Sequence, residues 1–297
     1  METQRRAYLY AIAAVLLWAT VASGIKISLR YVDILQLLFY ASVISAAAIF
    51  LILLLQGKLS LLKECSRRDY LRSVLLSLLN PFLYYIVLFK AYSLLPAQEA
   101  QPLNYTWPIM LVLLSIPLLK QRVRIRSILA ILISFAGVIV IATRGELLEF
   151  RFSSLPGATL ALSSSLIWAL FWIYNLRDKR DAAVKLFLIF ASGSLLILPL
   201  ALLYSTLGIS SLSGFLGVGY VGLFEMGITF VVWLKALELS STTARVSNLI
   251  YAAPFLSLLI IRSAVGERIL LSTIVGLSLI VTGILVQQRW NGPTVRG

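Results

Sequence analysis

The chain has 297 residues, of which 60% are hydrophobic and 13% are charged. A soluble domain of this length needs more polar residues to cover its surface, so the composition excludes that class and indicates a membrane protein. A formal net charge of +14 would suit nucleic acid, but the Lys and Arg residues stand in short clusters between long apolar runs, as in loops beside anionic lipid. We therefore expect membrane lipids, and no nucleic acid, as partners.

Ten apolar windows follow one another along the chain. Each has close to the roughly 20 residues that a helix needs to cross about 30 Å of hydrocarbon. They lie at residues 7–28, 34–55, 71–92, 98–119, 124–144, 155–175, 185–206, 214–236, 243–263 and 270–288. Because the connections are short, the sequence predicts an all-α membrane protein of ten transmembrane helices with no soluble domain.

The first window follows two arginines and so resembles a secretory signal peptide. However, its Trp18-Ala19 pair recurs 150 residues later as Trp168-Ala169. We therefore interpret the first window as a retained helix and as the counterpart of the sixth.

Further pairs relate the two halves at an offset of 145 or 146 residues. They are Lys90-Ala91 with Lys235-Ala236, Tyr105-x-x-Pro108 with Tyr251-x-x-Pro254, Arg122 with Arg268, and Gly137 with Gly283. Five helices are an odd number, so the second half enters the membrane from the opposite face. The sequence thus predicts two inverted repeats around a central cavity, at residues 1–145 and 146–290, with a short polar tail at 291–297.

The basic residues predict the topology. With the N-terminus inside, nineteen of the 26 Lys and Arg residues fall on the inner side and seven on the outer side. This bias predicts a multi-pass protein of the cytoplasmic membrane with both termini in the cytoplasm. The sequence leaves the oligomeric state open, and a monomer is our starting assumption.

Polar and aromatic residues near the middle of the spans are the candidates for a substrate site. In the fourth window Gln101, Asn104, Tyr105 and Pro108 follow the i, i+3, i+4, i+7 spacing of one helix face. Polar groups are costly in lipid, so this face should point inward. Trp107 lies about 100° away and would flank the same cavity.

The third and ninth windows repeat this combination of Asn, Tyr and Pro, and the sixth adds a deep tryptophan. Prolines in corresponding places of two halves are a pointer to a midplane site, although a deep aromatic ring can equally fill the bundle core. The predicted substrate-binding residues are Asn80, Tyr84, Gln101, Asn104, Tyr105, Trp107, Trp168, Glu225, Asn248 and Tyr251, and the predicted helix breaks are Pro81, Pro108 and Pro254.

Glu225 is the sharpest of these residues, because a carboxylate in mid-span costs roughly 2.5 to 3.5 kcal/mol on insertion scales. It stands at the repeat position of Asn80. It could anchor a substrate ammonium group or carry a coupling proton, or it could be a neutral or salt-bridged acid that packs the bundle. By contrast, Lys90 and Lys235 lie near span ends, where snorkelling explains them.

Several other features argue against chemistry. The Gly217-Val218-Gly219-Tyr220-Val221-Gly222 run matches a dinucleotide fingerprint but lies in a span without a βαβ unit, so we interpret it as helix packing. The sequon at Asn104 lies inside a span, out of reach of a glycosyltransferase. The chain has no histidine and a single cysteine, Cys65, which we expect to be inert. We therefore predict no metal, no cofactor and no enzyme activity.

Several motifs resemble those of the drug/metabolite transporter superfamily, in its ten-helix EamA-type branch, over nearly the whole chain. They are Trp18-Ala19, Trp168-Ala169, Tyr251-x-x-Pro254 and Gly266-Glu267, and the run Asn104-Tyr105-Thr106-Trp107-Pro108 is similar to that of bacterial aromatic amino acid exporters. The resemblance implies a cavity bounded by the third, fourth, eighth and ninth helices and the export of small metabolites. Two residues depart from the pattern: Gln121, where the second half has Glu267, and the mid-span Glu225.

Together these features predict a secondary transporter that exports amino acids, aromatic ones included, by alternating access. The nearest alternative is a sugar-phosphate or nucleotide-sugar exchanger of the same fold, which would need Lys or Arg deep in the cavity. A channel, a lipid-handling protein and a structural membrane protein are the others. Without histidine, proton coupling would have to run through an acid such as Glu225, so passive facilitation is equally compatible with the sequence.

Overall fold

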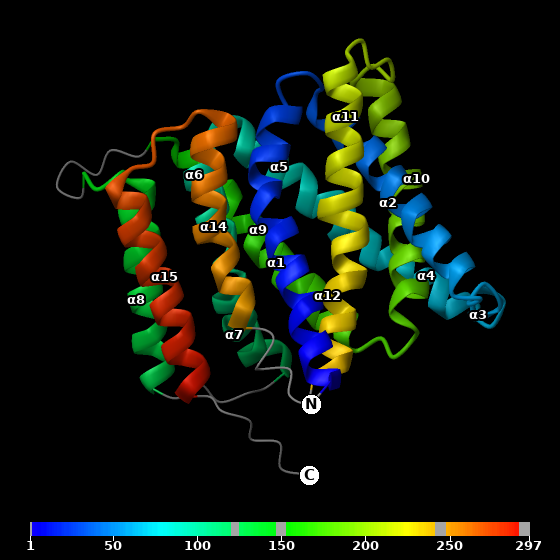
Figure 1. The fold of residues 1–297 in the computed structure, drawn as a ribbon, viewed down its shortest axis with the longest axis horizontal. Helices are drawn as coiled ribbons and strands as arrows, with labels where there is room; N and C mark the ends of the chain where they lie inside the picture. Colours follow the sequence, from blue (N-terminus) through cyan, green and yellow to red (C-terminus); the bar gives the residue numbers. More distant parts are fainter. Residues whose placement is uncertain (1, 120–124, 147–152, 241–247, 291–297) are drawn as a thin grey trace.

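The computed structural model describes residues 2–119, 125–146, 153–240 and 248–290. Within these ranges all regular structure is helical, and no strand occurs in them. The helices form one bundle, in which α1 begins and α15 ends at the same end (Figure 1). The predicted tail at 291–297 and the residue Gln121 lie outside the described residues.

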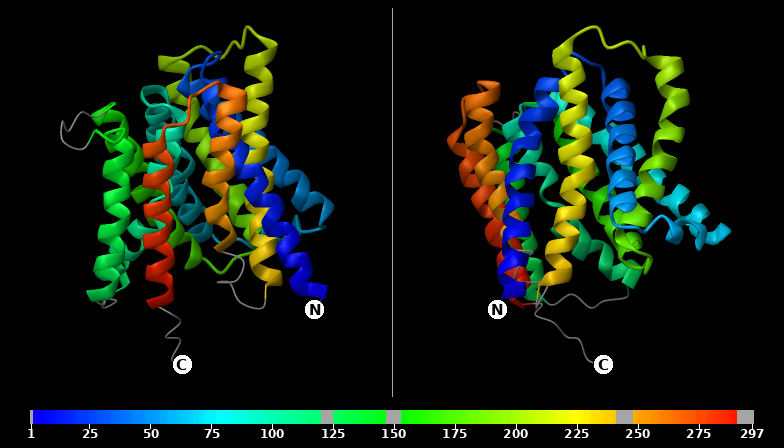
Figure 2. Two further views of the ribbon diagram at one scale, coloured as in Figure 1. Left: turned by 60° about the vertical axis from the view of Figure 1, so that its left-hand side comes forward. Right: turned by 45° about the vertical axis from the view of Figure 1, so that its right-hand side comes forward.

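Six helices of the bundle have no interruption. They are α1 (Glu2–Ser28), α2 (Ile34–Leu55), α8 (Ile125–Ala142), α9 (Leu155–Leu176), α10 (Ala182–Tyr204) and α15 (Leu271–Trp290). Polar caps fix several of their starts: Asp33 accepts from the amides of Leu35 and Gln36 ahead of α2, and Asp181 caps α10 in the same way. The short α3 (Ser60–Lys63) projects from the side of the bundle together with the start of the next helix (Figure 2).

The other four predicted windows contain breaks. The third consists of α4 (Arg67–Ser77), the π-helical η1 (Leu78–Leu83) and α5 (Tyr84–Leu94), and the fourth of α6 (Ala97–Asn104) and α7 (Trp107–Leu119). The eighth consists of α11 (Leu212–Val221), the π-helical η2 (Gly222–Gly227) and α12 (Ile228–Leu239). The ninth is described from residue 248 onward, as η3 (Asn248–Tyr251), α14 (Ala252–Ile260) and η4 (Ile261–Val265).

The chain leaves regular helical geometry beside each of the three highlighted prolines. Asn80, just before Pro81, has φ −147° and ψ 120°. Pro108 and Pro254 instead lie in the first turns of α7 and α14, where the missing N–H of proline has no helical acceptor to lose. The continuous face that we expected from Gln101 to Pro108 is therefore interrupted, because α6 ends at Asn104 and α7 begins only at Trp107.

Six segments are long and apolar enough to cross a membrane, judged by length and composition. They are Glu2–Ser28, Ile34–Leu55, Arg67–Leu94, Leu155–Asn175, Ala182–Tyr204 and Leu212–Trp233. Three shorter apolar helices, Ile131–Ala142, Leu249–Val265 and Leu271–Val286, coincide with the fifth, ninth and tenth windows. The fourth window is the one divided into α6 and α7.

Helices of the first half pack mainly against helices of the second. The contacts join α2 with α10, α8 with α15, α1 with α12 and α14, and α9 with α5 and α7. When each helix is replaced by its counterpart five windows away, this set of pairs maps onto itself. The pair α8 and α15 stands at one edge of the bundle, and α2 and α10 stand at the other (Figures 1 and 2).

Close backbone contacts explain several glycines. A Cβ added to Gly137 on α8 would lie 2.4 Å from the carbonyl oxygen of Gly276 on α15. In the dinucleotide-like run, Gly217 lies against Ser28 of α1 and Gly222 lies against the Ala41 carbonyl of α2, whereas Gly219 faces open space. Two of the three glycines therefore serve helix packing, which agrees with the interpretation from sequence.

Candidate functional site

A buried chain of hydrogen bonds joins three helices in the middle of the bundle. The hydroxyl of Tyr84, at the start of α5, donates to Asn104 Oδ1 at 3.4 Å. Asn104, the last residue of α6, donates through Nδ2 to Ser164 Oγ on α9 at 2.8 Å. All three side chains are buried. The sequence singled out Tyr84 and Asn104, and the structure adds Ser164 between them and the sixth window.

An aromatic wall lies beside this chain. Trp168, one turn beyond Ser164 on α9, stacks on Tyr84 with ring centroids 4.6 Å apart and an interplanar angle of 29°. Phe230 of α12 meets the edge of Trp168 at 5.6 Å, and it also contacts Trp18 of α1 at 6.0 Å. The stack that would suit a substrate ring is thus occupied, in this conformation, by the ring of Tyr84.

Glu225 is buried in η2 and has a single described partner. The hydroxyl of Tyr85 donates to Glu225 Oε1 at 3.1 Å, and both side chains are at least nine-tenths buried. No Lys or Arg among the described residues forms an ion pair with it, so the salt-bridged interpretation finds no support in this part of the chain. Tyr85, which the sequence analysis missed, packs edge-on against Tyr84 at 4.6 Å.

These contacts connect the two halves in one group, which we call the central cluster: Tyr84, Tyr85, Asn104, Ser164, Trp168 and Glu225. Two predicted residues near it retain unused polar atoms. Neither side-chain polar atom of Asn80 has a hydrogen-bond partner among the described residues, and the same holds for Gln101 Oε1. A buried polar group without a partner costs about 1–3 kcal/mol, so these amides are candidates for contact with a substrate or water.

The remaining predicted residues lie outside the central cluster. Tyr105 and Trp107 are half-buried at the break between α6 and α7, and neither stacks on or hydrogen-bonds to a member of the central cluster. Tyr251 is buried at the end of η3. Asn248 begins η3, and its side chain lies outside what the structure describes.

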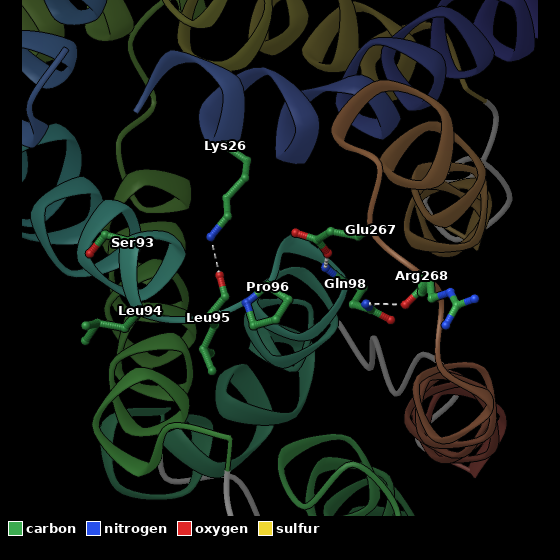
Figure 3. Close-up of a pocket in the computed structure, with 8 residues that line it drawn as sticks. All are labelled: Lys26, Ser93, Leu94, Leu95, Pro96, Gln98, Glu267 and Arg268. Atoms are coloured by element: carbon green, nitrogen blue, oxygen red, sulfur yellow. Dashed lines mark hydrogen bonds between the residues drawn. The ribbon is translucent and has the colours of Figure 1, made fainter. Parts of the chain in front are cut away.

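A second polar region lies at the end of the bundle opposite the start of α1. An open pocket of about 410 Å³ is lined there by Lys26, Ser93, Leu94, Leu95, Pro96, Gln98, Glu267 and Arg268 (Figure 3). Lys26 Nζ donates to the carbonyls of Tyr92 and Leu95, at 2.6 Å each. The Glu267 carboxylate accepts from the amides of Ala97 at 2.9 Å and Gln98 at 3.2 Å, and so caps the N-terminus of α6.

The side chain of Gln98 completes this junction. Its Nε2 donates to the Arg268 carbonyl at 2.7 Å, and its Oε1 accepts from the Leu270 amide at 2.9 Å and from Thr273 Oγ1 at 3.2 Å. Next to it Glu99, fully buried, accepts from Arg144 Nε at 2.8 Å. The sequence analysis noted Glu267 only as part of a motif and missed Gln98 and Glu99. An acidic residue directly after Pro96 was the available signal for a helix start.

The opposite end of the bundle holds an ionic cluster. Arg180 binds the buried carboxylate of Asp178, with Nη2 and Oδ2 2.5 Å apart, and also donates to Ser73 Oγ on α4 at 3.0 Å. Although burial raises the pKa of Asp178, the hydrogen bonds and charge of Arg180 lower it further, so the net pKa lies below its usual value. The pKa of Asp181 is likewise lowered, since Lys58 at 2.8 Å outweighs its burial.

The chain is similar to known transporters over most of its length. The family model described as the EamA-like transporter family matches residues 5–143 and again residues 155–287. An uncharacterized transporter of Archaeoglobus fulgidus is 25% identical over 286 residues, which are 94% of this chain and 96% of that protein. The aromatic amino acid exporter YddG of Ancylobacter novellus is 29% identical over 185 residues, which are 61% of this chain and 63% of that exporter. A crystal structure with 24% identity matches 96% of this chain and 99% of its own with a TM-score of 0.67, so the two share a fold.

Proposed function

The chain belongs to the EamA-like transporter family, whose model matches most of it in two parts, and from this premise we propose that it exports amino acids, aromatic ones included, across the cytoplasmic membrane by alternating access. Members of this family are transporters. The substrate, the direction and the mechanism are our proposal, and the central cluster carries it.

The chemistry of the central cluster suits a zwitterion with a ring. Stacking of a substrate ring against Trp168 would contribute about 0.5–1.5 kcal/mol, and an ammonium group over an aromatic face about 0.5–2 kcal/mol. The Glu225 carboxylate could receive the ammonium group, and the unpartnered amides of Asn80 and Gln101 could receive the substrate carboxylate. In this arrangement a substrate ring displaces Tyr84 from the stack seen here.

A phosphorylated substrate fits these residues less well. Recognition of phosphate relies on Arg or Lys, whereas the charged member of the central cluster is an acid. The described Lys and Arg side chains with known partners bind at the two ends of the bundle, as Lys26 and Arg180 do. A sugar-phosphate exchanger therefore remains the second candidate.

We further propose ten transmembrane helices in two inverted repeats, at residues 1–145 and 146–290. Two observations support this arrangement: the family model matches twice, and the helix pairs map onto themselves when the halves are exchanged. Exchanging the conformations of such halves opens one central site to each side in turn. Because α1 begins and α15 ends at the same end of the bundle (Figure 1), the basic residues there favour a cytoplasmic location for both termini.

Efflux from liposomes tests the proposal. Purified protein is reconstituted in liposomes loaded separately with labelled phenylalanine, threonine or a sugar phosphate, and efflux is followed with and without a pH gradient. We expect saturable efflux of phenylalanine that is strongly reduced in Trp168→Leu and unchanged in Tyr204→Phe, a matched aromatic change at an exposed position.

Each other outcome of this assay has a definite meaning. Efflux of the sugar phosphate alone would replace the proposal with the exchanger. Efflux of every solute without saturation would indicate a channel. If phenylalanine efflux is insensitive to the pH gradient, the protein is a facilitator, and if it follows the gradient, Glu225 becomes the candidate for the coupling group.

A further inference from the structure

We propose that Glu267 is a positioning residue for transport: its grip on the N-terminus of α6 keeps one end of the transport path closed and holds Asn104 in the central cluster. This inference rests on the proposed transport function for its purpose but not for its test. We call the contacts of Glu267, Gln98 and Lys26 around Pro96 the end latch (Figure 3).

The pocket at the end latch is a junction between elements and not a vacant ligand site. The carboxylate of Glu267 is engaged by two backbone amides of α6, and the side-chain amide of Gln98 by three groups of the loop and helix that follow Glu267. Lys26 Nζ is engaged by two carbonyls at the end of α5. The polar side chains that line the pocket thus already bind protein backbone, and they join parts of the chain about 170 residues apart.

The end latch grips both sides of one hinge. Leu95 is extended, with φ −119° and ψ 153°, and Pro96 precedes α6. Lys26 places a positive charge at the carbonyl end of α5, and Glu267 places a negative charge at the amide end of α6. Each charge complements the dipole of the helix terminus that it meets.

α6 can transmit the state of the end latch to the central cluster. The helix runs from Ala97 to Asn104, roughly 10 Å at 1.5 Å per residue. It is separated from α5 by the extended Leu95 and from α7 by the turn at Tyr105-Thr106, so it is a short rod with a joint at each end. When its first turn is released, Asn104 at its last turn moves with it, and the bonds to Tyr84 and Ser164 are those that change.

A single-cysteine experiment tests this role. Cys65→Ser removes the one native cysteine, Ser164→Cys then reports access to the central cluster, and Ser93→Cys on the exposed rim of the pocket reports which membrane side carries the end latch. Labelling by a membrane-impermeant maleimide is measured from each side of vesicles of known orientation.

Glu267→Ala should raise the labelling of the cysteine at 164 from the side that labels the cysteine at 93 by about fivefold, the size expected for loss of a typical helix cap. Glu267→Gln, which keeps an acceptor oxygen, should fall between Glu267→Ala and the parent. Arg268→Ala is the matched control, because this exposed residue lines the same pocket but contributes only its backbone carbonyl to the end latch. It should leave the labelling unchanged.

Three results would overturn the inference: labelling in Glu267→Ala that stays at the Arg268→Ala level, an equal rise from both sides of the membrane, which would mean a loosened fold, and a rise in Arg268→Ala as large as in Glu267→Ala. Because the assay needs no substrate, it separates the two proposals. A one-sided rise in a protein that moves no amino acid refutes the proposed function alone, and amino acid efflux without that rise refutes the end latch alone.

Discussion

The flanking helix pairs and the broken helices between them differ in what interrupts them and in what they carry. The pairs α2 with α10 and α8 with α15 are continuous and pack through small residues such as Ala41, Gly137 and Gly276. The third, fourth, eighth and ninth windows each leave regular α-helical geometry, and they carry Asn80, Asn104 and Glu225.

This difference has a physical basis. In hydrocarbon an unpaired backbone group is costly, so irregular backbone is tolerated only where protein encloses it. The continuous pairs supply that enclosure: α2 packs against η2, and α10 packs against η1. The flanking pairs therefore act as a frame, and the breaks they enclose expose the polar groups that can meet a substrate.

The largest effect should come from overpacking the frame. A Cβ on Gly137 would meet the Gly276 carbonyl at 2.4 Å and Ile280 Cγ1 at 2.9 Å, so Gly137→Ala forces α8 and α15 apart. We expect a loss of stability of about 1–3 kcal/mol, measured as a lower melting temperature and a lower yield of monodisperse protein in detergent. Efflux per correctly folded molecule should stay at the parent level.

Gly219→Ala is the matched control, since no atom lies within 4 Å of the added Cβ. Alanine is the better helix former by up to about 1 kcal/mol, so this variant should be as stable as the parent or slightly more so. Equal losses at Gly137 and Gly219, or a fall in efflux per molecule in Gly137→Ala, would erase the distinction between frame and site.

The next largest effect should come from Glu225, with the opposite signature. Glu225→Leu removes the mid-span carboxylate, which costs roughly 2.5–3.5 kcal/mol to insert, but leaves the Tyr85 hydroxyl without its acceptor, at about 1–3 kcal/mol. These terms nearly cancel, so the melting temperature should change little while efflux falls at least about tenfold, the equivalent of 1.4 kcal/mol.

Glu225→Gln distinguishes charge from hydrogen bonding, because the amide oxygen can still accept from Tyr85. If the carboxylate anchors the substrate ammonium group, both variants lose efflux. If it only packs the bundle, Glu225→Gln transports like the parent, and the central cluster loses its charged member as a functional residue.

The sequence predicts the continuous helices well because their limits are written in local chemistry. The second window was placed at 34–55, and α2 spans Ile34–Leu55 because the polar Asp33 and Gln36 form a capping box at its start. The fourth window shows the opposite. Hydropathy cannot detect the turn at Tyr105-Thr106, because the residues on both sides are apolar enough to continue a helix.

The central cluster was predictable where a residue is costly in lipid and hidden where it is not. Glu225, Asn104 and Trp168 stood out by type and depth. Ser164 did not, because a serine in an apolar helix commonly bonds its own backbone, as Ser164 Oγ also does to the Ala161 carbonyl at 2.6 Å. The pairing of Tyr85 with Glu225 spans 140 residues and leaves no local pattern.

Within the central cluster, Asn104→Leu should have a moderate effect on efflux. It removes the acceptor of Tyr84 and the donor to Ser164, each bond being worth about 0.5–1.5 kcal/mol. We expect KM to rise several-fold for phenylalanine and threonine alike. Tyr84→Phe keeps the stack on Trp168 and loses a single long bond of 3.4 Å, so its KM should change less than twofold. A larger effect from Tyr84→Phe would assign the hydroxyl, and not the amide, to the substrate.

The smallest effect concerns the ionic cluster of Asp178 and Asp181, which lies outside both the frame contacts and the central cluster. Their pKa values are lowered in the folded protein, so the unfolded chain takes up more protons in acid. The stability that they contribute is therefore complete above about pH 5 and is lost as the pH falls below about 4. Asp181→Asn keeps a side chain able to cap α10 but loses the ion pair with Lys58, so we expect a slightly lower melting temperature at pH 7 and a shallower decline between pH 5 and pH 3. Glu64→Gln makes the same change of charge at an exposed position nearby and should leave the decline unaltered. If both variants follow the parent curve, the acid limb of stability arises elsewhere in the chain, and the ionic cluster is a solvated surface feature and not a brace between α4 and α10.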